Sequence, residues 1–281
     1  MKKVALTALV TFVIGIIGMF ILSGTNVSLG KNIKIDERKT VLTKSVEDMV
    51  IKVDIGEVII KESESDEIDI RFHGSIPKNM KDNISFTVEE KDSLVEVKID
   101  EREDFFSLHI PFIHSDLDTE RILEIGIPKN TLKTLDVKTD IGKISIKDLD
   151  VEKMKAHSDV GEVYVLGHNG VGSFQSNVGE VKLEKMSGKI VAHTDTGEIL
   201  LSILDMTEDI ELSSNLGAVN VKFEKEPANI GFDLTTDIGE VSISGFEGLG
   251  DRSSGSMITQ IGSGGPQLKV TTDIGEITIN K

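Results

Sequence analysis

Acidic side chains recur at two fixed positions of a short phrase that this sequence repeats, as in TDIGEVSI (236–243). The second position carries Asp or Asn, and the fifth most often carries Glu. If successive copies stack about 5 Å apart, as neighbouring β-strands do, their carboxylates could share a Ca²⁺ ion between coils. The candidate calcium ligands are Asp159, Glu162, Glu180, Asp195 and Glu198.

The alternative interpretation of these positions is structural. Asp and Asn side chains bond to nearby backbone groups in turns, and Asn177 and Asn215 interrupt the run of Asp, which dilutes the repulsion between carboxylates. The sequence also lacks the double-glycine pattern of calcium-binding β-rolls. We therefore favour a hydrogen-bonded ladder, and we expect neither a bound metal nor another cofactor.

Carboxylate pairs about 5 Å apart also match the spacing of retaining glycosidases. Here the pairing repeats along the chain, so no single pair stands out, and aromatic platforms for a sugar are scarce because aromatic residues make up 4% of the chain.

His157 and His193 share a repeat position with Gln175 between them, which puts them ~9–10 Å apart, too far to share a metal. His109 and His114 show no recognisable ligand spacing. The sequence predicts no catalytic residues and a protein that is not an enzyme.

The repeat itself predicts the fold. Eight copies of the phrase occur, and from the second copy onward they are 19, 18, 18, 20, 22 and 36 residues apart. A fixed period near 20 residues is typical of solenoids, in which each coil buries its apolar column only against its neighbours. We expect an all-β protein, a β-solenoid of stacked 18–22-residue coils. Each copy contains one turn glycine: Gly56, Gly142, Gly161, Gly179, Gly197, Gly217, Gly239 and Gly275.

The apolar positions of the phrase predict two short strands and a corner in each coil. The sixth and eighth residues alternate as a strand requires, as do residues upstream such as Leu135 and Val137. The third residue is also apolar, and we expect a turn at the glycine, where a positive φ is accessible, to bring it inside with the sixth. The last interval of 36 residues covers two periods, which indicates that one coil has degenerated or been replaced by the Gly/Ser-rich stretch 244–266.

Three segments lie outside this regular pattern. Residues 4–22 carry no charge and would span roughly 28 Å as a helix, about one hydrocarbon core. We expect a retained transmembrane anchor rather than a cleaved signal peptide, with residues 1–3 in the cytoplasm. Residues 23–40 are expected to form a juxtamembrane linker. The solenoid domain then covers 41–281, with an irregular insertion or irregular coils at 61–132.

Composition limits the partners. The net charge of −17 repels nucleic acid and anionic membrane surfaces. The chain has no Cys, which excludes disulfides and thiolate chemistry. The expected partners are the membrane, through residues 4–22, and an unidentified envelope or membrane protein, with no nucleic acid.

The motifs resemble a known family. Recurrent S/T-D/N-x-G-E-I-x-I phrases, the entry Ile125-Gly126-Ile127-Pro128 and the closing GSGGP (262–266) before TDIGE (272–276) are similar to the bacterial putative-adhesin repeat family. With a single N-terminal anchor, the chain is most similar to its LiaG-like members, associated with cell-envelope stress. The resemblance implies a cell-membrane protein with one span and an extracytoplasmic C-terminal domain, acting as a non-enzymatic accessory of the envelope stress response. The alternatives are an outward-facing adhesin or a calcium-dependent binding module.

Overall fold

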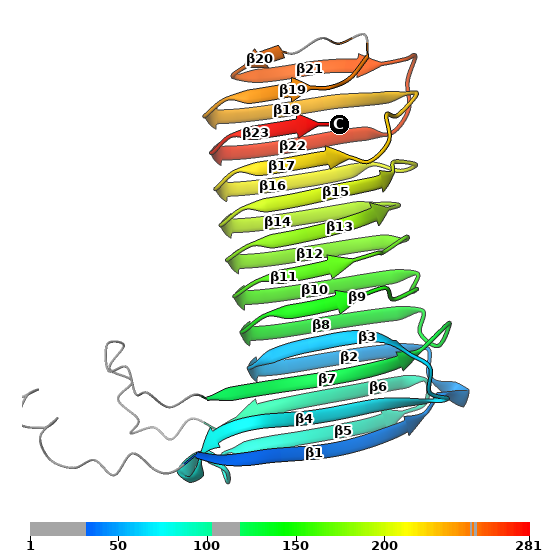
Figure 1. Ribbon diagram of the computed structural model, residues 1–281, viewed down its shortest axis with the longest axis vertical. Helices are drawn as coiled ribbons and strands as arrows, with labels where there is room; N and C mark the ends of the chain where they lie inside the picture. Colours follow the sequence, from blue (N-terminus) through cyan, green and yellow to red (C-terminus); the bar gives the residue numbers. More distant parts are fainter. Residues whose placement is uncertain (1–31, 103–118, 248, 250–251) are drawn as a thin grey trace, which may run out of the picture.

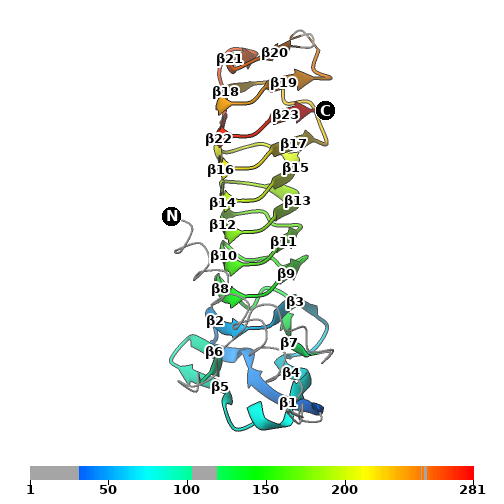
Figure 2. The ribbon, with the colours of Figure 1, turned by 90° about the vertical axis from the view of Figure 1, so that its left-hand side faces the viewer.

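Two long β-sheets run the length of the molecule and face each other across one core (Figures 1 and 2). The computed structural model describes residues 32–102, 119–247, 249 and 252–281. Within them the protein is all-β, with two short 3₁₀ turns, η1 (Thr43–Ser45) and η2 (Lys78–Met80). None of the helices in these ranges is long and apolar enough to cross a membrane. The expected anchor at 4–22 lies outside the described residues.

Sheet I has twelve strands and sheet II has eleven. In spatial order, sheet I contains β1 (Asn32–Leu42), β4 (Glu67–Pro77), β7 (Glu120–Pro128), β3 (Glu57–Ser63), β9 (Ile144–Lys147), β11 (Val163–Leu166), β13 (Val181–Ser187), β15 (Ile199–Asp205), β17 (Val219–Phe223), β23 (Ile277–Asn280), β19 (Val241–Ser244) and β20 (Arg252–Ser254). Sheet II contains β21 (Ser256–Ile261), β18 (Ile230–Ile238), β22 (Gln267–Ile274), β16 (Ile210–Leu216), β14 (Ile190–Thr196), β12 (Val171–Val178), β10 (Lys153–Val160), β8 (Thr134–Ile141), β2 (Asp48–Ile55), β6 (Leu94–Glu101) and β5 (Ile84–Lys91).

Each copy of the phrase links one strand of sheet II to one strand of sheet I. In the central stack every strand pairs in parallel with its equivalents in the coils on either side, for example β10 with β8 and β12. The sixth and eighth residues of all eight copies are buried between the sheets, from Val58 and Ile60 to Ile277 and Ile279. The stacked parallel coils confirm the all-β repeat architecture that the period predicted.

The two ends of the stack are closed by antiparallel strands. At one end β1 and β5 form the sheet edges, and at the other end β20 and β21 do. An uncapped solenoid would present open strand edges to other chains. Residues 61–132 supply much of the first cap. β6 and β7 add one more level to the stack, parallel to β2 and β3, and β5 and β4 then pair antiparallel with β6 and β7 respectively.

The structure corrects the expected linker at 23–40. Residues 32–40 belong to β1, which pairs antiparallel with β4 over its whole length. Arg71 of β4 donates two hydrogen bonds of 2.8 Å to the Asp36 carboxylate on β1. The many charged residues that suggested a linker are those of a solvent-facing edge strand, where charge also discourages pairing with another chain.

The C-terminal coil also differs from expectation. The sequence predicts that one coil has degenerated or been replaced by the stretch 244–266. In the structure, β22 and β23 enter the stack between β16–β17 and β18–β19 (Figure 1). The coil made by β18 and β19 therefore lies farther from the centre than the coil that follows it in sequence. The long interval of 36 residues reflects this excursion through the cap and back, and no level of the stack is missing between Gly239 and Gly275.

Deleting residues 267–281 tests this inserted coil. We expect β18 to β21 to lose amide protection in hydrogen exchange, because the deletion removes the strands that join them to β16 and β17. Strands β8 to β13 should keep their protection. Removing Lys281 alone is the control, since it deletes only an exposed ion pair with Glu226. Full protection of β18 in the truncated chain would contradict the inserted topology.

Candidate binding surface along the repeat corner

The eight-residue phrase forms a corner, here called the phrase corner, at which the chain passes from sheet II to sheet I. Its first residue is Ser or Thr in seven copies and is buried in each of them. In six copies the hydroxyl donates to the carbonyl oxygen of the phrase glycine in the adjacent coil, as Ser158 does to Gly142 at 2.9 Å and Ser176 to Gly161 at 2.7 Å. The Thr139 hydroxyl is buried without a partner. These bonds satisfy polar groups inside the corner and hold adjacent coils together.

The phrase glycines are stacked so closely that a side chain has no room. A Cβ on Gly142 would lie 1.9 Å from the carbonyl oxygen of Gly56, and one on Gly179 would lie 2.1 Å from that of Gly161. The φ angles of these glycines are near +150°, a region that other residues rarely adopt. Gly275 has no such positive φ, but a Cβ added to it would likewise lie 2.0 Å from the Gly217 carbonyl oxygen. The glycine is therefore required by contact between coils as well as by its own conformation.

The third residue of the phrase points outward, which corrects the expectation that it joins the core. The exposed fractions of Ile141, Val160, Val178 and Leu216 lie between 47% and 50%, and that of Ile238 is 65%. The first residue of the phrase fills the interior just before the corner. The chain then turns, and the third residue of the phrase faces outward. We call this column the corner stripe. In stacking order its members are Ile55, Ile141, Val160, Val178, Thr196, Leu216, Ile274 and Ile238.

The second phrase position forms a column of Asp and Asn beside the stripe. Asn177 donates from Nδ2 to Asp159 Oδ1 at 3.1 Å, and Asn215 donates to Asp195 at 3.0 Å. The hydrogen bond from the His157 ring holds the pKa of Asp159 below its usual range, with Lys138 adding to the effect. Asn placed between Asp residues thus turns a repulsive column into a bonded one.

The fifth position forms a column of Glu on the other side of the stripe. Lys143 pairs with Glu162 at 2.8 Å. Among the residues that the structure describes, Glu180 and Glu198 have no cation within ion-pair distance. The pKa of Glu180 is raised by partial burial and by the carboxylates of Glu162 and Glu198. Across the described ranges, no three His, Asp or Glu residues come together so that they could hold a metal ion, and the five calcium candidates lie within these two columns.

The sequence of the whole repeat region identifies its family. The sequence model of the Toastrack DUF4097 family matches residues 46–169 and 173–280. The chain belongs to the Toastrack DUF4097 family. No curated protein matches this Toastrack chain in sequence.

Solved structures similar to this Toastrack chain carry names of adhesion or binding proteins. A putative cell adhesion protein from Clostridium sporogenes is 14% identical, with 88% of this chain and 99% of that chain covered and a TM-score of 0.37. A putative adhesin from Bacteroides fragilis is 16% identical, with 89% and 97% covered and a TM-score of 0.36. A putative lipid binding protein from Parabacteroides distasonis is 13% identical, with 87% and 94% covered and a TM-score of 0.27.

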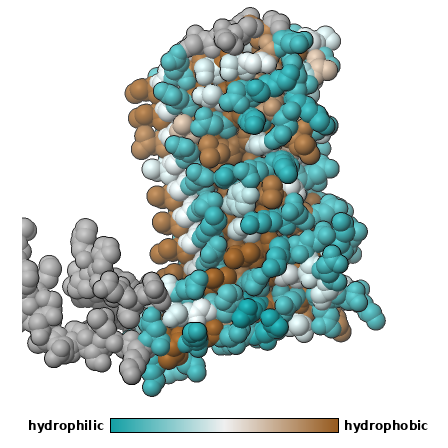
Figure 3. All heavy atoms as spheres, viewed as in Figure 1, coloured by the Kyte–Doolittle hydropathy of each residue, from teal (hydrophilic) through white to brown (hydrophobic). Residues whose placement is uncertain are grey.

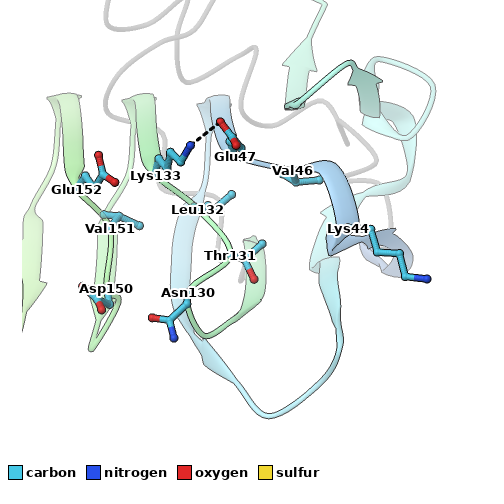
Figure 4. Close-up of a pocket in the computed structure, with 10 residues that line it drawn as sticks. All are labelled: Lys44, Val46, Glu47, Asn130, Thr131, Leu132, Lys133, Asp150, Val151 and Glu152. Atoms are coloured by element: carbon cyan, nitrogen blue, oxygen red, sulfur yellow. Dashed lines mark ion pairs between the residues drawn. The ribbon is translucent and has the colours of Figure 1, made fainter.

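The Toastrack chain has a cleft of about 440 Å³ at the opposite corner of the stack (Figure 4). Lys133 pairs with Glu47 across it at 2.9 Å, and this contact raises the pKa of the lysine. Its ten lining residues include no His, Ser, Cys or Tyr. The cleft therefore offers charged groups, and the ion pair with Glu47 favours the protonated, non-nucleophilic form of Lys133.

The histidines of the Toastrack chain occupy different environments. His157, Gln175 and His193 are in register on three adjacent strands, and each of the two histidines bonds to an Asp two residues on. His109 and His114 lie outside the described residues. Sequence reasoning missed His168, whose ring is buried against Phe174 with neither nitrogen hydrogen-bonded. His168 sits in an HNG sequence that resembles a hairpin turn, and no pattern around it marked it as buried.

The stacked glycines give a stability prediction. Gly179→Ala should lower the free energy of unfolding in urea by ~2–4 kcal/mol, because its methyl group would overlap the Gly161 carbonyl at a strained φ. Gly264→Ala has a φ of +129° but open space, so it isolates the backbone strain, and Gly255→Ala has open space and no positive φ. The contact explanation is wrong if Gly179→Ala costs no more than Gly264→Ala.

His168 gives a pH prediction. Burial lowers its pKa, so below about pH 6.5 the unfolded chain takes up a proton that the folded chain does not. The free energy of unfolding should therefore fall as the pH drops from 7.5 through 6.5 toward the lowered pKa. Urea midpoints across this range should flatten in His168→Leu and keep their slope in the control His193→Gln. An unchanged slope in His168→Leu would assign the pH dependence to other groups.

Proposed function

We propose that this Toastrack protein is a non-enzymatic binding scaffold, tethered to the cell membrane and displayed in the cell envelope. The observation that carries the proposal is the phrase corner, which repeats one outward-facing set of side chains over eight coils. Catalysis concentrates distinctive groups at one place. This surface instead presents similar groups at most levels, as an extended binding surface does.

The uncharged segment 4–22 supports a single membrane span, with the C-terminal domain outside the cytoplasm. Because β1 begins at Asn32, only residues 23–31 remain between the span and the sheets. Nine residues reach at most ~30 Å. A tether of that reach keeps the near end of the stack close to the bilayer, which favours a partner at the membrane over one on another cell.

The finer role we propose is that of a LiaG-like accessory of the envelope stress response, acting through a membrane or cell-wall protein. The support is the layout of the chain, in which one N-terminal apolar segment precedes a single Toastrack region. The acidic columns fit this role because they face outward at the level of each coil. They would not suit a surface that lies against anionic lipid.

The scaffold proposal is tested by changing Glu162, Glu180 and Glu198 to Gln singly and together, in a strain whose own copy of the gene is deleted. We expect each single variant to support growth under envelope stress nearly as well as the wild type, and the triple variant to lose crosslinking to its partner while remaining folded by circular dichroism. A single variant as defective as the triple, beside two silent neighbours, would indicate catalysis by one carboxylate.

Protease added to intact protoplasts should digest the domain, and full protection would contradict an extracytoplasmic location.

A further inference from the structure

The corner stripe is an exposed apolar column that the fold does not need. Seven of its eight side chains are apolar, and Figure 3 shows apolar side chains projecting in a row from one edge of the molecule. The strand register places each member directly beside the next. Eight levels at about 4.8 Å make a straight ridge ~34 Å long. Contiguous exposed apolar surface of this kind marks an interaction site.

Backbone preference does not explain the stripe. β-Branched residues suit an extended position before the corner, but Thr196 meets that preference with a polar side chain in the middle of the stack. Leu216 is apolar without being β-branched and is 49% exposed. The shared property of the column is therefore its apolar character, and Thr is tolerated there by the fold.

Charge flanks the ridge on both sides and defines what can cover it. One side carries the Asp and Asn column, and the other carries the Glu column, interrupted by Lys143 and Ala218. A second copy of this chain would bring acidic columns against acidic columns, and an anionic lipid surface would meet the same repulsion. Cationic side chains on both flanks of a partner would relieve the repulsion among Glu162, Glu180 and Glu198, which adds to partial burial in raising the Glu180 pKa.

The spacing of the ridge fits a helix. An α-helix rises about 5.4 Å per turn, close to the ~4.8 Å between coils, so an apolar helical face can follow the stripe for several turns. A helix of ~22 residues matches the ~34 Å ridge. We propose that the corner stripe docks the apolar face of a basic amphipathic helix, with Lys or Arg on its flanks reaching the Asp and Glu columns. This assignment rests on the proposed scaffold function and names the partner chemistry.

The probe is a 22-residue synthetic helix with Leu along one face and Lys on both flanks. Its controls are the same peptide with every Lys changed to Glu, and a scrambled peptide with the original composition. The full-length protein is held in phosphatidylcholine nanodiscs, and binding to empty discs is subtracted. Peptide fluorescence anisotropy gives the Kd. We expect the Lys peptide to bind at least about tenfold more tightly than either control peptide, and its affinity to weaken as salt screens the charges.

The protein variants use exchanges that the fold tolerates. Val160→Thr/Val178→Thr should weaken binding of the Lys peptide by about tenfold or more, while Thr196→Val, which closes the one polar gap, should tighten it several-fold. The matched control is Val171→Thr/Val191→Thr, because Val171 and Val191 are 45% and 39% exposed on the same sheet but toward the other end of their strands. The control should bind within about twofold of the wild type.

Four results would overturn the proposal. Equal loss in the stripe and control variants would show that the stripe is not the site. Equal binding of the scrambled peptide would reduce the effect to net charge, and equal binding of the Glu peptide would remove the role of the acidic columns. Dimers in sedimentation that Val160→Thr/Val178→Thr dissociates would make a second copy the occupant. A failed protease-accessibility test would instead contradict the extracytoplasmic location and leave the peptide result standing.

Discussion

Close contact between the glycines of successive coils is the constraint on which the rest of this structure depends. In seven of the eight copies the backbone of the phrase glycine lies against the carbonyl of the phrase glycine in the adjacent coil, and a buried Ser or Thr hydroxyl donates to that carbonyl in most copies. No side chain fits between the coils at this point, so every corner has the same shape. Because the corners are alike, the strands on both sides keep one register along the stack and the apolar columns between the sheets are continuous.

Much of this fold could be predicted from the spacing of the phrase. The period gave the stacked coils, and the alternation of residues such as Leu135 and Val137 gave the buried faces. The prediction for the third residue is wrong because its apolar character does not reflect burial. In the structure, the alternation of buried and exposed residues shifts by one residue at the corner. The regular alternation within the strands on either side does not reveal this shift.

The order of the coils could not be predicted for a different reason. Copies such as TDIGEVSI (236–243) and TDIGEITI (272–279) are nearly identical, so their sequences do not indicate which neighbours each copy pairs with. What decides their positions is the cap made by β20 and β21, which pairs antiparallel with β19 and β18 and covers the outer side of that coil. The prediction of a linker at β1 is wrong for another reason. β1 is an edge strand that pairs on one side only, and its many charged residues do not show the pattern of a buried strand.

The place of the last coil has a consequence for the order in which the molecule is made. Residues 267–281 are synthesised after β18 and β19, yet β22 and β23 lie between that coil and the coil of β16 and β17. The chain is synthesised from its N-terminus onward, and the parts made first can fold before the later parts exist. The stack up to β17 can therefore form progressively, but β18 and β19 are joined to it only after β22 and β23 have been made. The outer coil made by β18 and β19 must therefore wait for strands that follow it in the sequence before it can join the stack.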